Sequence, residues 1–387
     1  MKLDPSHYEG RGPALVKHTF IQKYLPRLIA KIASRYDEFV YVDLFAGPWK
    51  ERTKDLSDTA FGIAMSAMRG AKARWKQNGR SVKMTAHLVD LNSDAIEKQK
   101  YLIAKYPDIE VHQYQGTAEA KLSSILSSIP TNAFCFGFID PKGVPDIRKF
   151  QSLIERPNTE IFLNFMFEFA NRFASTERMP TLEWLTEVNE RDAFREEISE
   201  LSGNEREVAL TDRARFALAR MGDFRFAPAI TVDEEDADRC LYKLILLSRH
   251  EMGLQVFRDA QRAALEIQAM NRSDRKSVKR ATQSGMEDMF VDIEPINPAE
   301  RSAKEIQNGV NDGKRCAFEI IREAGTQGIS WGALWPKVLE ENVLTHSDLG
   351  DIVVSMRDSG QISIRGWEPR VRKPRDGYQL IDCSKKS

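Results

Sequence analysis

The sequence has few cysteines, and they lie far apart. Cys135, Cys240, Cys316 and Cys383 form no Cys-x-x-Cys pair. This spacing argues against a zinc module or a disulfide framework, and it is typical of a reducing compartment. No set of His, Cys and Asp residues has metal-ligand spacing, so we expect no metal.

Long apolar runs and an excess of charge of one sign are also missing. No stretch is long enough to span a bilayer, and residues 1–5 lack the apolar core of a signal peptide. The 57 basic residues balance the 57 acidic ones. We therefore expect a cytoplasmic protein without a membrane partner, in which any binding to nucleic acid comes from local patches.

Several familiar site motifs are absent as well. The sequence has no Gly-x-Ser-x-Gly, no Gly-x-x-x-x-Gly-Lys-Ser/Thr and no complete Gly-x-Gly-x-x-Gly. A serine hydrolase and a P-loop protein therefore have no support, and the full dinucleotide fingerprint is lacking.

What the first 270 residues do contain is an alternation of apolar strands and helices. The alternation predicts a doubly wound α/β sheet covered on both faces. A helical insertion is expected at about 178–222, followed by an antiparallel hairpin. The strands are expected at 39–44, 84–90, 110–114, 133–139, 160–165, 224–231 and 239–248.

The rest of the chain predicts a linker and a small domain. Residues 271–300 are polar, with scattered basic residues and prolines, which is typical of a linker. Residues 301–387 contain three capped helices and two strands that flank a basic loop. That pattern predicts a winged helix-turn-helix domain.

Acidic residues stand at or just beyond the ends of three predicted strands. Asp43 precedes the small-residue turn at Ala46 and Gly47, Asp90 ends the second strand, and Asp140 follows the fourth. Because the carboxyl ends of parallel strands meet at one edge of a sheet, we expect the three carboxylates to share one cleft.

This arrangement resembles a class I S-adenosylmethionine-dependent methyltransferase. The resemblance implies that S-adenosylmethionine is the cofactor and that Asp43, Phe45, Ala46 and Gly47 hold its methionine portion. Asp90 would accept the ribose hydroxyls, and Thr117 with Ala118 would meet the adenine. Trp49 stands where such enzymes usually have a second glycine. The alternative for each is an ordinary turn or a helix cap.

The turn Asp140-Pro141-Lys142-Gly143 would lie nearest the transferred methyl group, so Asp140 and Lys142 are the catalytic candidates. Amino-methyltransferases carry the motif Asp/Asn/Ser-Pro-Pro-aromatic here, and this chain replaces the second proline and the aromatic residue. Lys142 could instead hold a phosphate or an oxyanion. The alternative is a tight turn with proline at its second position.

Residues that could contact a substrate lie in three places. Lys17 and His18 on the first helix could stand at the pocket lip, and Phe165 after the fifth strand could form its floor, although a lone histidine and an aromatic stripe are more often structural. The basic loop could contact phosphates, or it could be a solvated loop on a protein-docking module. Its candidates are Arg365, Arg370, Arg372 and Lys373.

The chain also resembles a narrower family, the three-Cys-motif partner proteins (TcmP) of bacteria and phages. The resemblance is carried by Lys17-His18 with Tyr24-Leu25, and by the stretches 41–48, 138–143, 241–250 and 253–254. It implies a partner with a three-cysteine motif that resembles radical S-adenosylmethionine enzymes, and a role in nucleic-acid modification, repair or phage defence.

Two functions remain open from the sequence. One is a nucleic-acid methyltransferase-like enzyme that uses S-adenosylmethionine. The other is a methyltransferase-fold subunit that has lost catalysis and recruits its partner enzyme to DNA or RNA. Trp49 and the missing second proline favour the second, whereas the three acidic strand ends favour the first.

Overall fold

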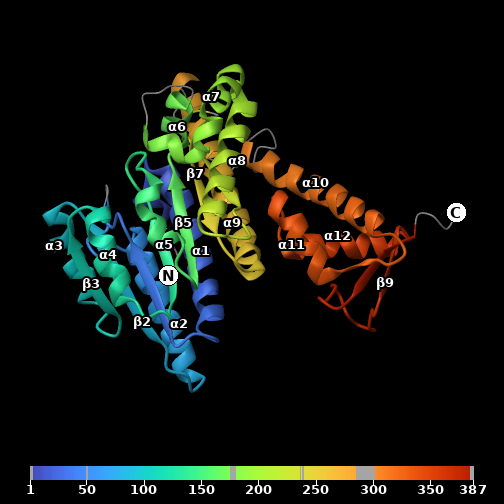
Figure 1. Ribbon diagram of the computed structural model, residues 1–387, viewed down its shortest axis with the longest axis horizontal. Coiled ribbons are helices and arrows are strands. Elements are labelled where there is room, and N and C mark those ends of the chain that lie inside the picture. The colour runs from blue at the N-terminus through green and yellow to red at the C-terminus, as the bar shows by residue number, and fades with distance from the viewer. Residues whose placement is uncertain are drawn as a thin grey trace. The chain divides into compact units, whose positions relative to one another are not determined.

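A computed structural model describes residues 3–48, 51–174, 180–235, 237, 239–284 and 301–383, with side chains omitted at 180, 181, 188 and 274–284. Trp49 therefore lies outside the described residues. Contacts between residues divide the chain into two compact units, Met1–His250 and Glu251–Ser387 (Figure 1). No described helix is both long enough and apolar enough to cross a membrane.

The first unit is built on a seven-stranded sheet in the order β3-β2-β1-β4-β5-β7-β6. Strands β1 to β5 are mutually parallel, and β7 runs antiparallel between β5 and β6. The predicted doubly wound sheet with a final antiparallel hairpin is confirmed. Its strands are β1 (Glu38–Asp43), β2 (Lys83–Asp90), β3 (Glu110–Gln115), β4 (Phe134–Ile139), β5 (Thr159–Phe165), β6 (Ala229–Asp233) and β7 (Cys240–Leu247).

The hairpin begins later than the sequence predicts. A strand was expected from residue 224, but only Phe226 makes an isolated bridge, to Ser248, before β6 starts at Ala229. Pro228 has no N–H to donate to a ladder, and Arg215 Nε binds the carbonyl of Ala227 at 2.5 Å. The continuous strand β6 therefore begins only after the proline.

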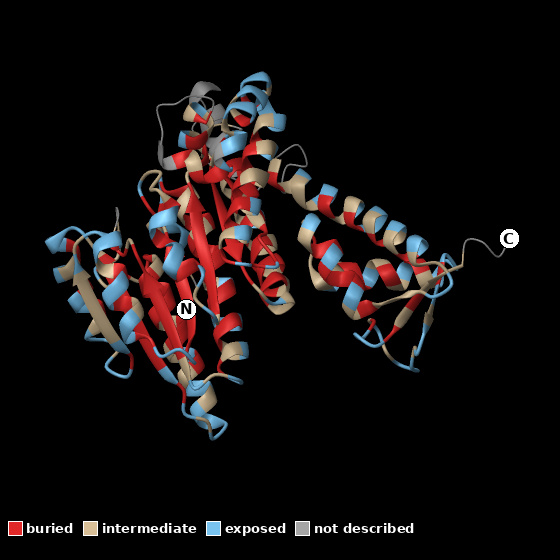
Figure 2. Ribbon diagram, in the orientation of Figure 1, coloured by how far each residue is buried: buried red, intermediate tan, exposed pale blue. Residues whose placement is uncertain are grey.

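Helices cover both faces of this sheet, as the buried residues of Figure 2 indicate. One face is aliphatic and packs under the helices α4 to α8. The other is aromatic; Phe20 stacks on Phe162 there, and the Tyr24 ring lies tilted against Phe136. The helices are α1 (Gly12–Ile32), α2 (Ala60–Gln77), α3 (Ser93–Ile103), α4 (Ala118–Ser128), α5 (Gln151–Ile154), α6 (Phe167–Phe173), α7 (Arg191–Glu200) and α8 (Gly203–Met221).

Alternation along β1 decides which residues face α1. Val40 and Val42 belong to the aliphatic core, so Tyr41 and Asp43 point to the opposite, aromatic face. Helix α1 runs along that face and continues through Pro26, which is exposed and leaves the packed side undisturbed. Asp43 is thus placed beneath the N-terminal helix.

The second unit combines four helices with a small antiparallel sheet in the order β8-β10-β9. Trp331, Leu334, Leu349, Val353 and Leu380 are almost fully buried in its core. The two-residue strand β8 was not predicted. The elements are α9 (Glu251–Ser284), α10 (Arg301–Ala324), β8 (Ile329–Ser330), α11 (Trp331–Glu341), α12 (His346–Asp358), β9 (Ile362–Arg365) and β10 (Gln379–Asp382).

The sequence places the end of the first domain at residue 270, whereas the structure divides the chain at 250. The difference is helix α9. Arg258 donates to the carbonyls of Leu339 and Glu340 at the end of α11, at 2.6 and 2.7 Å, and Gln268 donates to Ser302 at 2.7 Å. These bonds join α9 to the second unit, and the expected linker at 271–300 falls partly within α9 and partly outside the described residues.

Candidate cofactor and acceptor site

A small cavity of about 60 Å³, partly open to solvent, lies at the carboxyl edge of the sheet in the first unit. Three chain segments and the end of β4 enclose it. Lys17 and His18 come from α1, and Arg11 precedes that helix. Asp43 ends β1, and Phe45, Ala46 and Gly47 lie in the turn after it. Phe61 comes from α2 with Asp58 just before it, and Phe138 comes from β4 with Asp140 just after it. The structure thus brings together seven of the residues expected from sequence.

Asp43 is a buried carboxylate at the end of β1, with 1% of its surface exposed. Its oxygens accept hydrogen bonds from the Tyr41 hydroxyl at 3.0 Å and from the Phe45 amide at 3.1 Å. Burial is the main reason that its pKa rises to about 7, and the nearby Asp140 raises it further. A cation placed in the cavity would therefore be attracted strongly by the ionised form.

Gly47 and Asp90 form a close contact that excludes any side chain at position 47. A Cβ added to Gly47 would lie 2.3 Å from Asp90 Oδ2. The other oxygen of Asp90 accepts a hydrogen bond from the Asn92 amide at 2.7 Å, which fixes the carboxylate. The turn after β1 is held beside β2 by the bond from the Ala46 amide to the Val89 carbonyl, at 2.8 Å. Asp90 therefore stands beyond Gly47, next to the cavity and outside its lining.

Asp140 is held by donors from two other elements. Lys17 Nζ on α1 lies 2.5 Å from Asp140 Oδ2, and Asn164 Nδ2 at the end of β5 donates to Oδ1 at 2.6 Å. The side chains of Lys17 and Asp140 are 14% and 18% exposed, so solvent screens this pair only in part. Lys17 Nζ also lies 5.9 Å from the centre of the Tyr242 ring on β7.

His18 belongs to the wall of the cavity as a neutral, hydrogen-bonded ring. Its Nδ1 lies 2.9 Å from the Tyr8 hydroxyl. Burial, with the positive charges of Lys17 and Arg11, lowers the pKa of His18 well below its usual value. Arg11 is paired with the buried Asp58 at 2.8 Å, so it is already neutralised.

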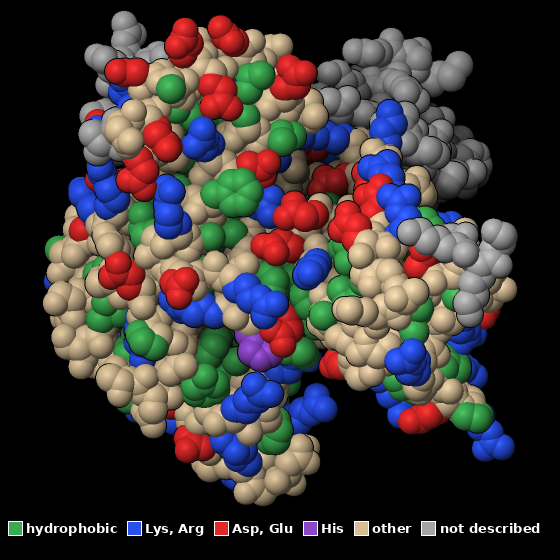
Figure 3. Space-filling view, turned by 45° about the vertical axis from the view of Figure 1, so that its right-hand side comes forward, with side chains coloured by type: hydrophobic (Ala, Val, Ile, Leu, Met, Phe, Trp, Pro, Cys, Tyr) green, Lys and Arg blue, Asp and Glu red, His purple; other side chains and the backbone are tan. Residues whose placement is uncertain are grey.

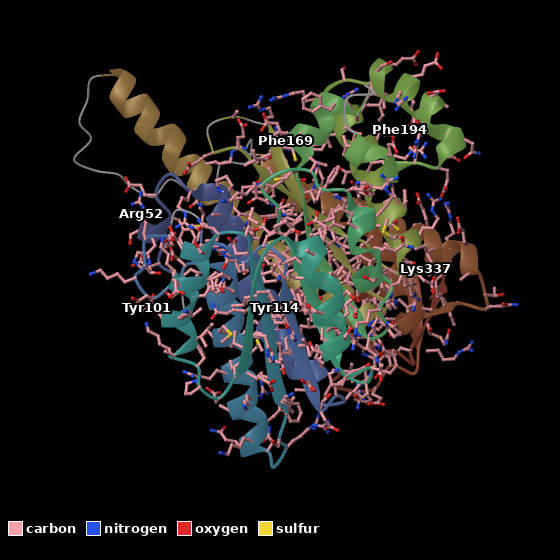
Figure 4. The ribbon with its side chains drawn as sticks, turned by 60° about the vertical axis from the view of Figure 1, so that its left-hand side comes forward. Arg52, Tyr101, Tyr114, Phe169, Phe194 and Lys337 are labelled. Atoms are coloured by element: carbon pink, nitrogen blue, oxygen red, sulfur yellow. The ribbon has the colours of Figure 1, made fainter. Side chains whose placement is uncertain are left out.

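Four expected site residues lie away from this cavity. Thr117 is exposed and caps α4, and Ala118 is buried under that helix, after the strand that carries Tyr114 in Figure 4. Lys142 points to solvent. Phe165 is 3% exposed, and its ring meets Trp184 edge to face, with ring centres 6.0 Å apart. Phe165 is therefore a packed core residue, as the alternative expectation of a structural aromatic stripe has it.

In the second unit, the basic loop between β9 and β10 presents free arginines. Arg365, Arg370 and Arg372 are exposed, and no ion pair involves them within the described chain. Lys373 differs, because its Nζ lies 3.0 Å from Asp351 on α12. Helix α12 itself exposes Asp351 and Asp358. On the molecular face drawn in Figure 3, basic and acidic side chains are interspersed.

Several residues that shape the cavity are not among those predicted from the sequence. Asn164 ends β5 on the same sheet edge as Asp140, so the rule applied to the acidic strand ends would have found it had it included amides. Arg11 and Asp58 pair across 47 residues, and Tyr242 arrives from the antiparallel β7. No local sequence pattern predicts those contacts. Among the described residues, no group of three or more acidic, His or Cys side chains has the geometry of a metal site.

The strand order of the large sheet has a known counterpart. An antiparallel strand inserted beside the last strand of a Rossmann-type order is the sheet of class I methyltransferases, as opposed to that of dehydrogenases. No known family matches the chain, and no curated protein is significantly similar to it.

Solved structures similar to parts of the chain include methyltransferases. An rRNA methylase from Streptococcus thermophilus shares 12% identity over 64% of this chain and 98% of its own, with a TM-score of 0.28. A dimethyladenosine transferase from Plasmodium falciparum shares 12% over 87% and 96%, with a TM-score of 0.26. A loganic acid methyltransferase with S-adenosylhomocysteine shares 9% over 75% and 94%, with a TM-score of 0.31. At such TM-scores these likenesses carry no argument, and what the chain shares with class I methyltransferases is the strand order.

Proposed function

We propose that the protein is an S-adenosylmethionine-dependent nucleic-acid methyltransferase whose cofactor lies at the carboxyl edge of the large sheet. The observation that carries the proposal is the meeting of Asp43, Gly47 and Asp90 at one turn. Bound there, the cofactor would supply an electrophilic methyl group, and the chain would supply position and alignment.

The residues present fit such a cofactor. Buried Asp43 would pair with the amino group of the methionine portion, whose positive charge offsets the cost of ionising this carboxylate. Asp90 Oδ2 would accept the ribose hydroxyls, a charge-assisted contact. Because Gly47 has no side chain, the backbone can pass close to Asp90. Thr117 and Ala118 remain candidates for the adenine contact on the side of Asp90.

Nucleic acid is proposed as the substrate because of the second unit. Its three helices α10 to α12 and the small sheet have the order of a winged helix-turn-helix, and Arg365, Arg370 and Arg372 stand free on the loop that would be its wing. These side chains would meet phosphates. Lys373 is less available because it is paired with Asp351.

The alternative is a binding subunit that has lost catalysis. The departure from the amino-methyltransferase motif at Lys142 and Gly143 favours it. The partner with a three-cysteine motif, and the roles in repair or phage defence, are further proposals that rest on the resemblance to TcmP proteins alone.

A calorimetric titration with S-adenosylhomocysteine separates these two functions. The enzyme proposal predicts one site of micromolar affinity, and transfer of a labelled methyl group from S-adenosylmethionine to nucleic acid. Cofactor binding without transfer would favour the binding subunit. Absence of any binding would overturn the methyltransferase proposal.

A further inference from the structure

Lys17 is the cationic group that the cavity presents beside the expected methyl position. It comes from α1, far from Asp140 in sequence, and the two side chains meet at 2.5 Å. Asp140 is its sole hydrogen-bond partner within the described chain. An ammonium group has three N–H donors, so two of them remain for a ligand.

Both oxygens of Asp140 are already engaged by donors, which leaves fewer acceptor sites for the amino group of a nucleobase. Each of its oxygens already accepts a bond, from Lys17 at 2.5 Å and from Asn164 at 2.6 Å. The aromatic ring that would stack on a flipped base is replaced by Gly143. The amino group of a nucleobase is itself a hydrogen-bond donor, and the Lys17 ammonium offers it only further donors.

An oxygen acceptor fits this arrangement better. A hydroxyl can contact Lys17 in either protonation state, because its oxygen accepts from the ammonium and its O–H donates to the lone pair of the amine. We infer that Lys17 is the catalytic residue of this site and that the methyl acceptor is a hydroxyl oxygen. This inference rests on the proposed function. Along the interior of a nucleic-acid chain the hydroxyl is the ribose 2′-OH, so the substrate is RNA.

In the proposed step Lys17 Nζ is the proton acceptor, and the Asp140 carboxylate lies beside it. The acceptor oxygen forms a bond to the methyl carbon with its lone pair, while the electron pair of the methyl–sulfur bond stays on sulfur. The hydroxyl proton moves to Lys17 Nζ, and the resulting ammonium is held by Asp140 until it passes the proton to water. Asn164 is a positioning residue, since it fixes the other oxygen of Asp140.

The product of methyl transfer tests the acceptor directly. The full chain is incubated with S-adenosylmethionine labelled in its methyl group and with total RNA or total DNA from the same cells. We expect label in RNA only, and in alkali-resistant dinucleotides, because a 2′-O-methyl group blocks alkaline cleavage. Label on a base, or in DNA, would overturn the inference and leave the proposed function standing.

The substitution Lys17→Arg tests the catalytic role of Lys17. The matched control is Lys23→Arg, since Lys23 lies on the exposed side of α1. Lys17→Arg keeps the positive charge beside Asp140 but cannot give up its proton. We expect it to bind S-adenosylhomocysteine like the wild type, yet to transfer methyl groups about 100-fold more slowly, the usual scale for a lost general base. Lys23→Arg should match the wild type in both assays. Undiminished transfer by Lys17→Arg would contradict the proposed role.

Binding provides a readout independent of turnover. In the presence of S-adenosylhomocysteine, fluorescence anisotropy compares one mixed-sequence RNA with its fully 2′-deoxy counterpart. The wild type should prefer RNA by about tenfold, as expected for a hydrogen bond to a charged group, and Lys17→Met should lose that preference. Equal preference in both proteins would count against the hydroxyl contact. Failure of the wild type to bind S-adenosylhomocysteine would instead remove the proposed function.

Discussion

The cavity of the first unit and the basic loop of the second differ in whether their charged side chains are buried and paired or exposed and unpaired. In the cavity, Arg11 is paired with Asp58 and Lys17 with Asp140, and all four side chains are less than one-fifth exposed. In the loop, Arg365, Arg370 and Arg372 are exposed and unpaired within the described chain. Buried charges need partners to offset desolvation, whereas exposed charges are stabilised by water.

This difference predicts different uses. Fixed, paired charges at a sheet edge suit the alignment of one small cofactor and one acceptor atom. Exposed, unpaired charges on a loop suit phosphate contacts, which add affinity without precise geometry. Substitutions in the cavity should therefore have large, specific effects, and substitutions in the loop should have smaller effects that depend on salt.

The largest expected effect comes from Asp90. Asp90→Ala removes the acceptor for the ribose hydroxyls, and two charge-assisted hydrogen bonds correspond to a loss of about 100-fold in affinity for S-adenosylhomocysteine. Calorimetry measures it. Asp94→Ala is the matched control, since Asp94 is exposed on the next helix. Equal affinity of the two variants would contradict the ribose contact.

Gly47 tests whether the turn and Asp90 act together. Gly47→Ala places a methyl group 2.3 Å from Asp90 Oδ2, so the carboxylate or the turn must move. We expect affinity for S-adenosylhomocysteine to fall by roughly 30-fold, because displaced charge-assisted hydrogen bonds are lost only in part. Gly143→Ala has open space around its Cβ and should behave like the wild type. Unchanged binding by Gly47→Ala would break the link between the turn and Asp90.

Asp43 should make cofactor binding depend on pH. Burial raises its pKa to about 7, so the carboxylate is largely protonated at pH 6 and becomes ionised above pH 7. A bound ammonium group favours the ionised form, so affinity should rise roughly tenfold between pH 6 and pH 7.5 by linkage. Calorimetry at several pH values measures this rise, and Asp43→Asn should abolish it. A wild-type affinity that is flat over this range would contradict the contact.

The raised pKa of Asp43 affects the stability of the fold in the opposite direction from the affinity for the cofactor. Between about pH 4, where an unfolded aspartate ionises, and pH 7, the folded chain holds one proton more than the unfolded chain at this residue. The contribution of Asp43 to stability therefore falls as pH rises through that window. The midpoint temperature of thermal unfolding of the wild type, measured relative to that of Asp43→Asn, should accordingly decrease from pH 5 to pH 8.

The smallest effect is expected in the loop. Replacing Arg365, Arg370 and Arg372 together by alanine should weaken RNA binding roughly fivefold at physiological salt, because exposed charge contacts are each worth little. The slope of log affinity against log salt should fall by about 2. Arg375→Ala is the control, since Arg375 is paired with Glu368 at 3.1 Å. An unchanged slope in the triple variant would remove the loop from the nucleic-acid surface.

The sequence was sufficient to predict the sheet and the residues at strand ends, because both follow from local patterns. Short, continuous apolar runs between helical segments mark the strands, which are buried on both faces. Parallel strands then bring Asp43, Asp90 and Asp140 to one edge. The environment of each carboxylate was not predictable, because it depends on α1 crossing that edge. Lys17 was named as a candidate, but its pairing with Asp140 arises from packing across 123 residues of chain.

The account depends most on the position of the cofactor, and a crystal structure with S-adenosylhomocysteine tests that position directly. It should show the amino group of the ligand at Asp43, its ribose at Asp90 and its sulfur facing Asp140 and Lys17. A ligand bound elsewhere, or a cavity closed to it at saturating concentration, would contradict the account.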